Sequence, residues 1–309
     1  MNRCPISYAK CEGRYSKEGL KLLSPKLLNL NKLEYSAEEQ RIEAARRADR
    51  MSIQGVQPKL SAVLNIKKQQ FDVVDIHGTY IIKPQHHIYP QLPENEDLTM
   101  KMAAVCGIET PIHGLIYSSD ESLSYFIKRF DRWGRGKKMP LEDFAQLSGE
   151  TRDTKYNYSI ERLIKLLDRY CTFPYLEKMK FYKRFLFNFL TGNEDMHLKN
   201  YSLITRNDKV ELAPAYDFLN SSIVIGANAV ESALTLKGKR TNISKDLLIN
   251  YLGRERLSLN EASMQNTLNE LKMTREKWFN LIDESFLTND LKDKYRTLLI
   301  HRMAMLFDH

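Results

Sequence analysis

Residues 190–202 read LTGNEDMHLKNYS and hold the strongest functional signal in the chain. They follow a strongly apolar segment, 176–190, in which apolar residues recur at helical spacing. An acid, a base and an amide then fall within six residues, between Asp195 and Asn200. A carboxylate can accept a proton and an amide oxygen can hold a hard cation, so these side chains form a candidate active site.

The interval from Asp195 to Asn200 is the Asp-x-x-x-x-Asn spacing found in the catalytic loop of protein kinases. In that loop the Asp accepts the proton of the attacking hydroxyl, and the Asn returns to hold Mg²⁺. A second metal ligand is expected after a nearby strand, and Asp217 follows a short strand that begins near Val210. Leu219 stands where the kinase Asp-Phe-Gly motif has glycine, which argues against a flip of that motif but not against a metal role.

Two further kinase-like features precede this stretch. Alternation along residues 80–83 places Lys83 on the strand face opposite Ile82, where it would pair with the α- and β-phosphates of ATP. Glu96, at the start of the next helix, is its expected ion-pair partner, with Glu94 as the competitor. Residues 52–59 lead into the first strand, where a phosphate-covering loop belongs, although a single glycine is a weak signal for one.

The hydrophobic pattern changes along the chain. Period-two alternation predicts antiparallel strands at 60–66, 73–76, 79–84 and 123–130, with a helix at 97–106 that stops at Gly107. Beyond Asp131, helical spacing dominates at 160–169, 176–190, 245–252, 259–271, 275–284 and 290–306. Residues 1–50 are mostly polar and charged, and Ser36 with Glu39 fits a capping box that starts a helix running to Arg50. The expected fold class is therefore α+β, with a β-rich part before a larger helical part.

Composition sets limits on the class of protein. The 309 residues carry 47 Lys and Arg against 39 Asp and Glu, a net charge of +8 that suits an anionic partner without showing one. The longest apolar runs are far too short to cross a bilayer, and the first residues hold no apolar stretch typical of a signal peptide. The four cysteines, Cys4, Cys11, Cys106 and Cys171, do not make a disulfide scaffold, and we expect buried thiols. A cytoplasmic, membrane-free location is the expectation.

Each candidate residue also has a simple structural explanation. Asp195 and Asp217 could cap turns, and Lys83 before Pro84 could be a solvated edge residue. The set decides between these interpretations, because a lysine, an acid, an amide and a second acid occur in kinase order across a β-to-α change of pattern. This combination favours a kinase.

These residues also resemble those of the HipA-like kinases, and most closely those of the shorter HipT-type toxins of three-gene toxin–antitoxin systems. The resemblance covers roughly residues 50 to 220 in the correct order. The blocks that carry it are Ser52–Lys59, Tyr80–Pro84, Pro93–Glu96, Ile127–Arg132, Leu141–Phe144, Gly192–Asn200 and Ala213–Asp217.

The resemblance implies a divergent two-lobe protein-kinase-like fold with a β-rich N-lobe and an all-helical C-lobe. Residues 1–50 would pack on the kinase, 51–130 would form the N-lobe and 131–309 the C-lobe. The implied activity is ATP- and Mg²⁺-dependent serine/threonine phosphorylation of a translation component, with an aminoacyl-tRNA synthetase as the suspected target.

The resemblance also implies roles for single residues. Asp195 would be the catalytic base, Asn200 and Asp217 would hold Mg²⁺, and Lys83 would contact ATP phosphates. The further implied ATP-binding positions are Gly55, Gln57, Lys59, Lys128, Phe130, His197, Lys199, Asn200 and Tyr216. Of these, Lys128 and Phe130 would face adenine through their main chain. Ser52 matches the autophosphorylated serine of the family, and Gln54 excludes a second modified serine in this loop.

Full-length HipA-type toxins carry an extra N-terminal subdomain, and the 50 or so residues before the loop are too few to hold it. The resemblance therefore implies two partners, a small HipS-like antitoxin and a HipB-like DNA-binding protein, without direct nucleic-acid binding by this chain. Two other classes stay open: a small-molecule or lipid kinase on the same fold, and a nucleotide-binding scaffold without catalysis.

Overall fold

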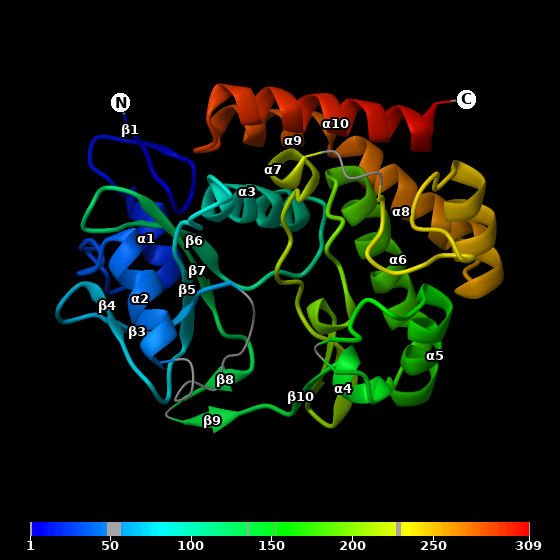
Figure 1. Cartoon of the computed structure of the whole chain (residues 1–309), viewed down its shortest axis with the longest axis horizontal. Coiled ribbons are helices and arrows are strands. Elements are labelled where there is room, and N and C mark those ends of the chain that lie inside the picture. Colours follow the sequence, from blue (N-terminus) through cyan, green and yellow to red (C-terminus); the bar gives the residue numbers. More distant parts are fainter. Residues whose placement is uncertain (1, 48–56, 135, 152, 227–229, 309) are drawn as a thin grey trace. The chain divides into compact units, whose positions relative to one another are not determined.

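The computed structural model describes residues 2–47, 57–134, 136–151, 153–226 and 230–308. The chain divides into two compact units, and most of their elements are labelled in Figure 1. Unit 1 comprises residues 1–98, 111–138 and 283–287, and unit 2 comprises residues 99–110, 139–282 and 288–309. Helix α3 (Leu92–Val105) contributes residues to both units.

Unit 1 is built on a five-stranded antiparallel sheet with the strand order β4-β3-β5-β7-β6. The expected strands at 60–66, 79–84 and 123–130 are confirmed, each within two residues at either end. The sheet also contains a strand at 113–117 that the sequence did not reveal, because four of its five residues are buried and so do not alternate. The strands are β3 (Leu60–Asn65), β4 (Gln70–Val73), β5 (Tyr80–Lys83), β6 (His113–Tyr117) and β7 (Leu123–Lys128).

The strand expected at 73–76 instead ends at Val73. Asn65 causes this shift, since its side chain accepts a hydrogen bond from the N–H of Lys68 at 3.1 Å and Gln69 adopts a φ of +54°. The chain therefore turns directly after β3 and pairs at once with it. Two short ribbons complete the strands of unit 1: β1 (Asn2–Arg3) with β2 (Lys10–Cys11), and β8 (Arg132–Trp133) with β9 (Lys137–Lys138).

The N-terminal segment contributes to the core of unit 1 despite its polar composition. Helix α1 (Lys17–Leu23) and the stretch that leads from it to helix α2 (Ala37–Arg47) supply leucines that pack with the sheet, and α2 adds Ala44. The capping box at the start of α2 is confirmed, because Glu39 accepts from the N–H of Ser36 at 2.8 Å and donates its own N–H to Ser36 Oγ at 3.2 Å. The buried leucines are Leu20, Leu23, Leu27, Leu30 and Leu33.

The predicted helices of unit 2 are confirmed within a few residues. The segment expected as a helix at 245–252 is π-helical, from Leu247 to Arg256, and no feature of the sequence explains this. None of the helices in the described residues is long and apolar enough to span a membrane. The helices are α4 (Phe144–Ser148), α5 (Ile160–Tyr170), α6 (Pro174–Thr191), α7 (Ser222–Ile225), α8 (Glu261–Met273), α9 (Arg275–Glu284, which ends in unit 1) and α10 (Asn289–Phe307).

The expectation of an all-helical second part is wrong. Unit 2 contains a three-stranded antiparallel sheet made of β10 (Leu141–Asp143), β11 (Ser202–Arg206) and β12 (Lys209–Leu212). Strands β11 and β12 are joined by a two-residue turn, and both Asn207 and Asp208 have positive φ, as the tight hairpin turn requires. An Asn-Asp pair between two short apolar runs is a hairpin signal that could have been recognised in the sequence.

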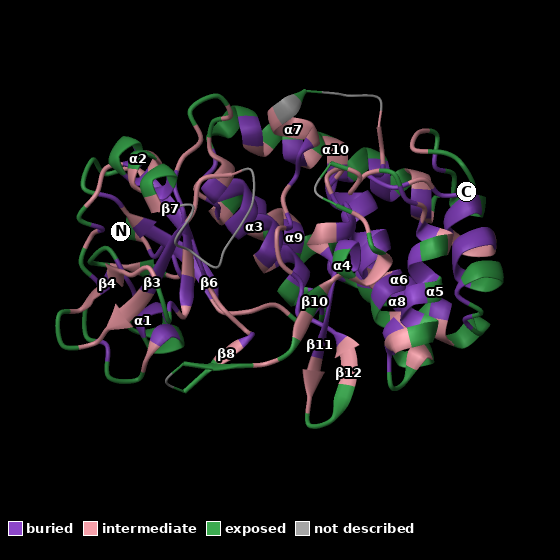
Figure 2. Ribbon diagram, turned by 60° about the horizontal axis from the view of Figure 1, so that its bottom comes forward, coloured by how far each residue is buried: buried purple, intermediate pink, exposed green. Residues whose placement is uncertain are grey.

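Helix α6 is the buried centre of unit 2, as Figure 2 shows by its colouring. It ends at Gly192, which has a φ of +67° and donates its N–H to the carbonyl of Phe189 at 3.4 Å. A Cβ atom at this position would lie 2.8 Å from Ser222 Oγ and 2.9 Å from Asn220 Oδ1. Only glycine meets both the backbone and the packing requirement here.

Gly192→Ala is expected to lower the free energy of unfolding by roughly 2–4 kcal/mol, because a left-handed alanine and a forced side-chain contact each carry a cost. The matched control is Gly149→Ala, since Gly149 also ends a helix at a φ of +73° but has nothing within 4 Å of an added Cβ. Urea unfolding of both variants measures the difference. Equal losses would show that the contacts with Ser222 and Asn220 do not restrict position 192.

Candidate active site

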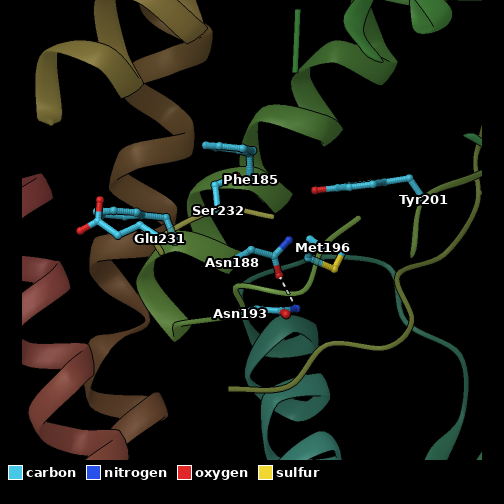
Figure 3. Close-up of a pocket in the computed structure, with 8 residues that line it drawn as sticks. Phe185, Asn188, Asn193, Met196, Tyr201, Glu231 and Ser232 are labelled. Atoms are coloured by element: carbon cyan, nitrogen blue, oxygen red, sulfur yellow. Dashed lines mark hydrogen bonds between the residues drawn. The ribbon is translucent and has the colours of Figure 1, made fainter. Parts of the chain in front are cut away.

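The candidate catalytic loop, residues 193–200, starts from a fixed point at the end of α6. Nδ2 of Asn193 donates to Oδ1 of Asn188 at 3.1 Å, and the N–H of Glu194 donates to Ser221 Oγ at 2.8 Å. Figure 3 shows Asn188 and Asn193 facing each other at a pocket of about 10 Å³, which is roughly the space of one water molecule. The pocket is lined by Phe185, Asn188, Phe189, Asn193, Met196, Tyr201, Glu231 and Ser232.

Asn200 closes the loop from its other end. After the 3₁₀ turn Leu198–Asn200, Nδ2 of Asn200 donates to the main-chain carbonyl of Asp195 at 2.9 Å. Because the amide nitrogen is held by that carbonyl, the amide oxygen of Asn200 points elsewhere, as a cation ligand must. The five-residue spacing seen in the sequence is thus the span of one closed loop.

Asp217 follows β12 in a backbone conformation that non-glycine residues rarely adopt, with a φ of +55°. Burial lowers the pKa of His197, while the charges of Asp195 and Asp217 both raise it, so both carboxylates lie in electrostatic range of one imidazole. A carboxylate and an amide oxygen are ligands that Mg²⁺ prefers. Asp217 and Asn200 therefore offer the types of ligand atom that such a cation takes, and a bound cation would neutralise phosphate charge.

Two residues that the sequence did not single out contact the loop. The hydroxyl of Tyr156 donates a short hydrogen bond to Oδ1 of Asp195. Its neighbour Lys155 lies with Nζ 2.7 Å from Nε2 of His197, and the carbonyl of Lys155 accepts from the N–H of Leu198 at 3.4 Å. No local pattern marks these residues, because they lie about 40 positions before the loop that they contact.

The contact with Lys155 sets the protonation of His197. An ammonium group only donates, so Nε2 of the imidazole accepts and the single proton of neutral His197 is on Nδ1. The pKa of His197 is lowered, first by burial and then by the Lys155 charge, which agrees with a neutral ring. Nδ1 has no hydrogen-bond partner among the residues that the structure describes.

Lys199 and Tyr216, both expected near ATP, also make contacts within unit 2. Nζ of Lys199 lies 2.8 Å from Oδ2 of Asp143, whose other oxygen caps α4. The Tyr216 hydroxyl bonds to Ser202 Oγ and donates to the carbonyl of Lys199 at 3.1 Å. Burial raises the pKa of Tyr216, so its phenol stays protonated and supports the loop as a donor.

The loop is also joined to the C-terminal helix by charge. Arg302 of α10 lies 3.8 Å from Oε1 of Glu194 and 2.8 Å from Oε1 of Glu231, and its side chain is only 9% exposed. Oε2 of Glu231 accepts in turn from the N–H of Ile243 at 2.6 Å. Burial raises the pKa of Glu194, and the Arg302 charge opposes that rise. The residue next to Asp195 is thus tied to a buried guanidinium.

In unit 1 the structure pairs Lys83 with Glu96. Nζ of Lys83 lies 2.7 Å and 2.9 Å from the two carboxylate oxygens of Glu96, and both side chains are almost completely buried. The ammonium group also lies 5.6 Å from the centre of the Tyr125 ring. A buried ammonium held this way is fixed in position and is a suitable contact for phosphate oxygens.

Glu94, the competing partner, bonds elsewhere. Both of its carboxylate oxygens accept from Nε2 of Gln85 at 2.8 Å. Burial raises the pKa of Glu94 to about 7, because the neighbouring amide only partly compensates for the loss of water. The two glutamates two residues apart on α3 therefore have different roles: Glu96 balances a charge, and Glu94 titrates near neutral pH.

For the remaining predicted ATP contacts, the structure gives mainly the position along the chain relative to strands β3 and β7. Gln57 and Lys59 are partly buried and lead into β3, as a phosphate-covering loop would. The N–H of Lys128 donates to the carbonyl of Ile112 at 2.8 Å, so an adenine contact of Lys128 would use its carbonyl oxygen. Phe130 lies two residues after the end of β7. Ser52 and Gly55 lie outside the described residues.

A family model described as the HipA-like C-terminal domain matches residues 51–278, most of the chain. The chain belongs to this family. Among relatives, the HipA-like chain is 28% identical over 345 residues to "Putative kinase" of Haemophilus influenzae, covering 99% of this chain and 98% of that one. The family was correctly identified from the motifs between residues 50 and 220.

Two further relatives are longer than this chain. "Putative kinase Y4dM" of Sinorhizobium fredii is 34% identical over 233 residues, which are 70% of this chain and 56% of the relative. The serine/threonine-protein kinase toxin HipA of Shewanella oneidensis is 29% identical over 191 residues, 55% and 43% of the two chains. The HipA-like chain thus spans about half the length of these two proteins.

Solved structures show the same fold. A chain from the complex of HipA, HipB and operator DNA of Shewanella oneidensis MR-1 superposes with a TM-score of 0.70 at 23% identity, covering 91% of this chain and 73% of that one. The proinflammatory kinase CtkA of Helicobacter pylori superposes with a TM-score of 0.55 at 16% identity, covering 74% of this chain and 88% of CtkA. The fold is therefore a mixed α+β fold similar to those of HipA and CtkA.

The free energy of unfolding of Glu94→Gln, taken relative to that of wild type, is expected to be about 2–3 kcal/mol higher at pH 8 than at pH 5. The folded-state pKa of Glu94 is raised from 4.5 to about 7, so wild type loses stability as pH rises through this window, whereas glutamine has no proton to lose. Urea unfolding at both pH values measures this. If the two proteins differed in free energy of unfolding by the same amount at pH 5 and at pH 8, the raised pKa of Glu94 would be contradicted.

Proposed function

We propose that this chain is an ATP- and Mg²⁺-dependent protein serine/threonine kinase that acts as the toxin of a toxin–antitoxin system. The observation that carries the proposal is the closed loop in which Asn200 bonds to the Asp195 carbonyl, with Asp217 in electrostatic range of the same imidazole. Family membership and the similarity to the Shewanella oneidensis HipA toxin support it.

In this proposal each of the candidate residues has a separate role in phosphoryl transfer. The Asp195 carboxylate accepts the proton of the attacking hydroxyl, while the hydroxyl oxygen bonds to the γ-phosphorus and ADP leaves. The Asn200 amide oxygen and the Asp217 carboxylate would hold the cation, which would neutralise phosphate charge, and Lys83, fixed by Glu96, would contact the phosphates. Lys59, Lys199 and His197 are proposed to lie near the phosphates, and Lys128 and Phe130 near adenine.

The finer assignment also remains our proposal. We assign the chain to the HipT type, with a small HipS-like antitoxin and a HipB-like DNA-binding protein as partners. The proposed acceptor is a translation component, an aminoacyl-tRNA synthetase, and Ser52 is the proposed site of autophosphorylation. The motif from Ser52 to Lys59 supports the assignment of the autophosphorylation site, and because position 54 is Gln54, Ser52 is the single serine of this motif.

Asp195→Asn is expected to lower phosphoryl transfer by at least about 100-fold while ATP binding is retained, because only the base is removed. Labelled ATP is incubated with wild type or variant, a cell extract and purified synthetases, and mass spectrometry locates the phosphate. The matched control is Asp208→Asn, the same chemical change at the β11–β12 turn, where asparagine also tolerates positive φ.

Label on a serine or threonine of a synthetase, lost with Asp195→Asn and kept with Asp208→Asn, would establish the toxin-kinase function. Phosphate on Ser52 of the chain itself would establish autophosphorylation. Label on a small molecule alone would make the chain a metabolite kinase, and retained transfer in Asp195→Asn would remove Asp195 from its proposed role.

Asp217→Asn is expected to weaken the affinity for ATP at least about tenfold in the presence of Mg²⁺ and to change it little in EDTA, because the lost charge acts on the cation. Asn keeps the shape of the side chain and tolerates the positive φ of this position. Calorimetric titration in both buffers measures the effect. An equal loss with and without Mg²⁺ would speak against a metal ligand at position 217.

A further inference from the structure

Tyr156 occupies a position that the proposed reaction has not used. Its hydroxyl donates to Oδ1 of Asp195, the carboxylate that must accept a proton in the proposed transfer. The ring packs edge-on against His197, with the ring centres 5.0 Å apart, and the Lys155 ammonium lies 4.9 Å from the centre of the same ring. The side chain is therefore held from several sides.

The main chain around Tyr156 is fixed as well. A guanidinium N–H of Arg240 donates to the Tyr156 carbonyl, and the carbonyl of Lys155 accepts from the N–H of Leu198 in the catalytic loop. Two residues further on, the Tyr158 carbonyl accepts from the N–H of Thr235 at 3.3 Å, just before α5 begins. Residues 155–158 are thus bonded both to the loop and to the segment around 235–240.

A fixed donor restricts what the carboxylate of Asp195 can do. The terminal torsion of an aspartate is soft, so an unsupported carboxylate rotates and its lone pairs change direction. A tyrosine has only two side-chain torsions, and here its ring is packed, so its hydroxyl is a rigid partner for Oδ1. Holding Oδ1 sets the direction of Oδ2, the oxygen that remains for an acceptor hydroxyl.

We propose that Tyr156 is a positioning residue for the proposed phosphoryl transfer: by holding Oδ1 of Asp195 it aims Oδ2 at the acceptor hydroxyl. This inference rests on the proposed function, since it assigns Asp195 as the base. Tyr156 acts through Asp195 and does not itself give up a proton. A rival role, in which the hydroxyl blocks the base until an acceptor displaces it, makes the opposite prediction for its removal.

Tyr156→Phe tests the assignment, because it removes only the hydroxyl and keeps the ring against His197. The full-length chain is assayed for Mg²⁺-dependent ATP hydrolysis, with water as the acceptor, and kcat and KM for ATP are measured separately. We expect kcat to fall about tenfold or more, as for loss of a hydrogen bond to a charged group, with KM within about twofold of wild type.

Tyr158→Phe is the matched control. Tyr158 is buried, whereas Tyr156 is half-buried, and the Arg162 guanidinium lies 4.0 Å from the centre of the Tyr158 ring. The control is expected to hydrolyse ATP like wild type. An equal loss of kcat in both variants would show a general effect of the 155–158 segment and overturn the specific role of Tyr156.

A spectroscopic signature tests the contact without relying on activity. The chain is labelled with 3-fluorotyrosine, and the ¹⁹F resonance of position 156 is identified by its loss in Tyr156→Phe. We expect this resonance to shift in Asp195→Asn, where the ionised acceptor is gone, and to stay unchanged in Asp208→Asn. A resonance that does not respond to Asp195→Asn overturns the inference.

The remaining outcomes separate the two proposals. Wild-type kcat and KM in Tyr156→Phe would overturn the positioning role while leaving the kinase intact, and a faster variant would replace it with the blocking role. If wild type neither hydrolyses ATP nor transfers phosphate to any acceptor, the proposed function fails. The ¹⁹F comparison would then still decide whether Tyr156 holds Asp195.

Discussion

The hydrogen bond from the Asn200 side chain to the main-chain carbonyl of Asp195 is the interaction on which the candidate active site depends. It closes a loop whose first residue is fixed by Asn188 of the buried helix α6 and whose last residue is separated from β11 by Tyr201 alone. With both ends held, the main chain at Asp195 is fixed, and the direction of the carboxylate itself is left to its contact with Tyr156. The proposed proton acceptor, Asp195, and the proposed cation ligand, Asn200, therefore belong to one hydrogen-bonded loop.

Much of this site could be predicted from the sequence because it is encoded locally. The distance from Asp195 to Asn200 along the chain equals the length of the loop that they close, and Lys83 and Glu96 stand on a strand and the helix that follows it. Three of the antiparallel strands of unit 1, namely β3, β5 and β7, were also found from the sequence. The family followed from these blocks together, whose order is far more specific than any one of them.

The rest depends on packing that no local pattern encodes. Tyr156 and Lys155 lie far along the chain from the loop that they contact, and Arg302 lies farther still. Strand β6 is buried and so lacks alternation, and β10 is only three residues long, too short to show a period. Glu96 was the expected partner of Lys83 and is in contact with it, but what separates it from Glu94 is side-chain direction on α3, which two acidic residues in one turn do not reveal.

The ion pairs of Arg302 have a consequence for how the protein can be inactivated. Arg302 belongs to the last two turns of α10, yet its partners are Glu194 beside the candidate base and Glu231 in the segment after α7. A frameshift or proteolytic trimming that removed only these turns would take the buried guanidinium away from two partly buried acids. The candidate catalytic loop would then lose a support that lies far from it in sequence. In a genetic selection for loss of activity, the last codons of α10 should therefore yield inactivating changes alongside those of the catalytic loop.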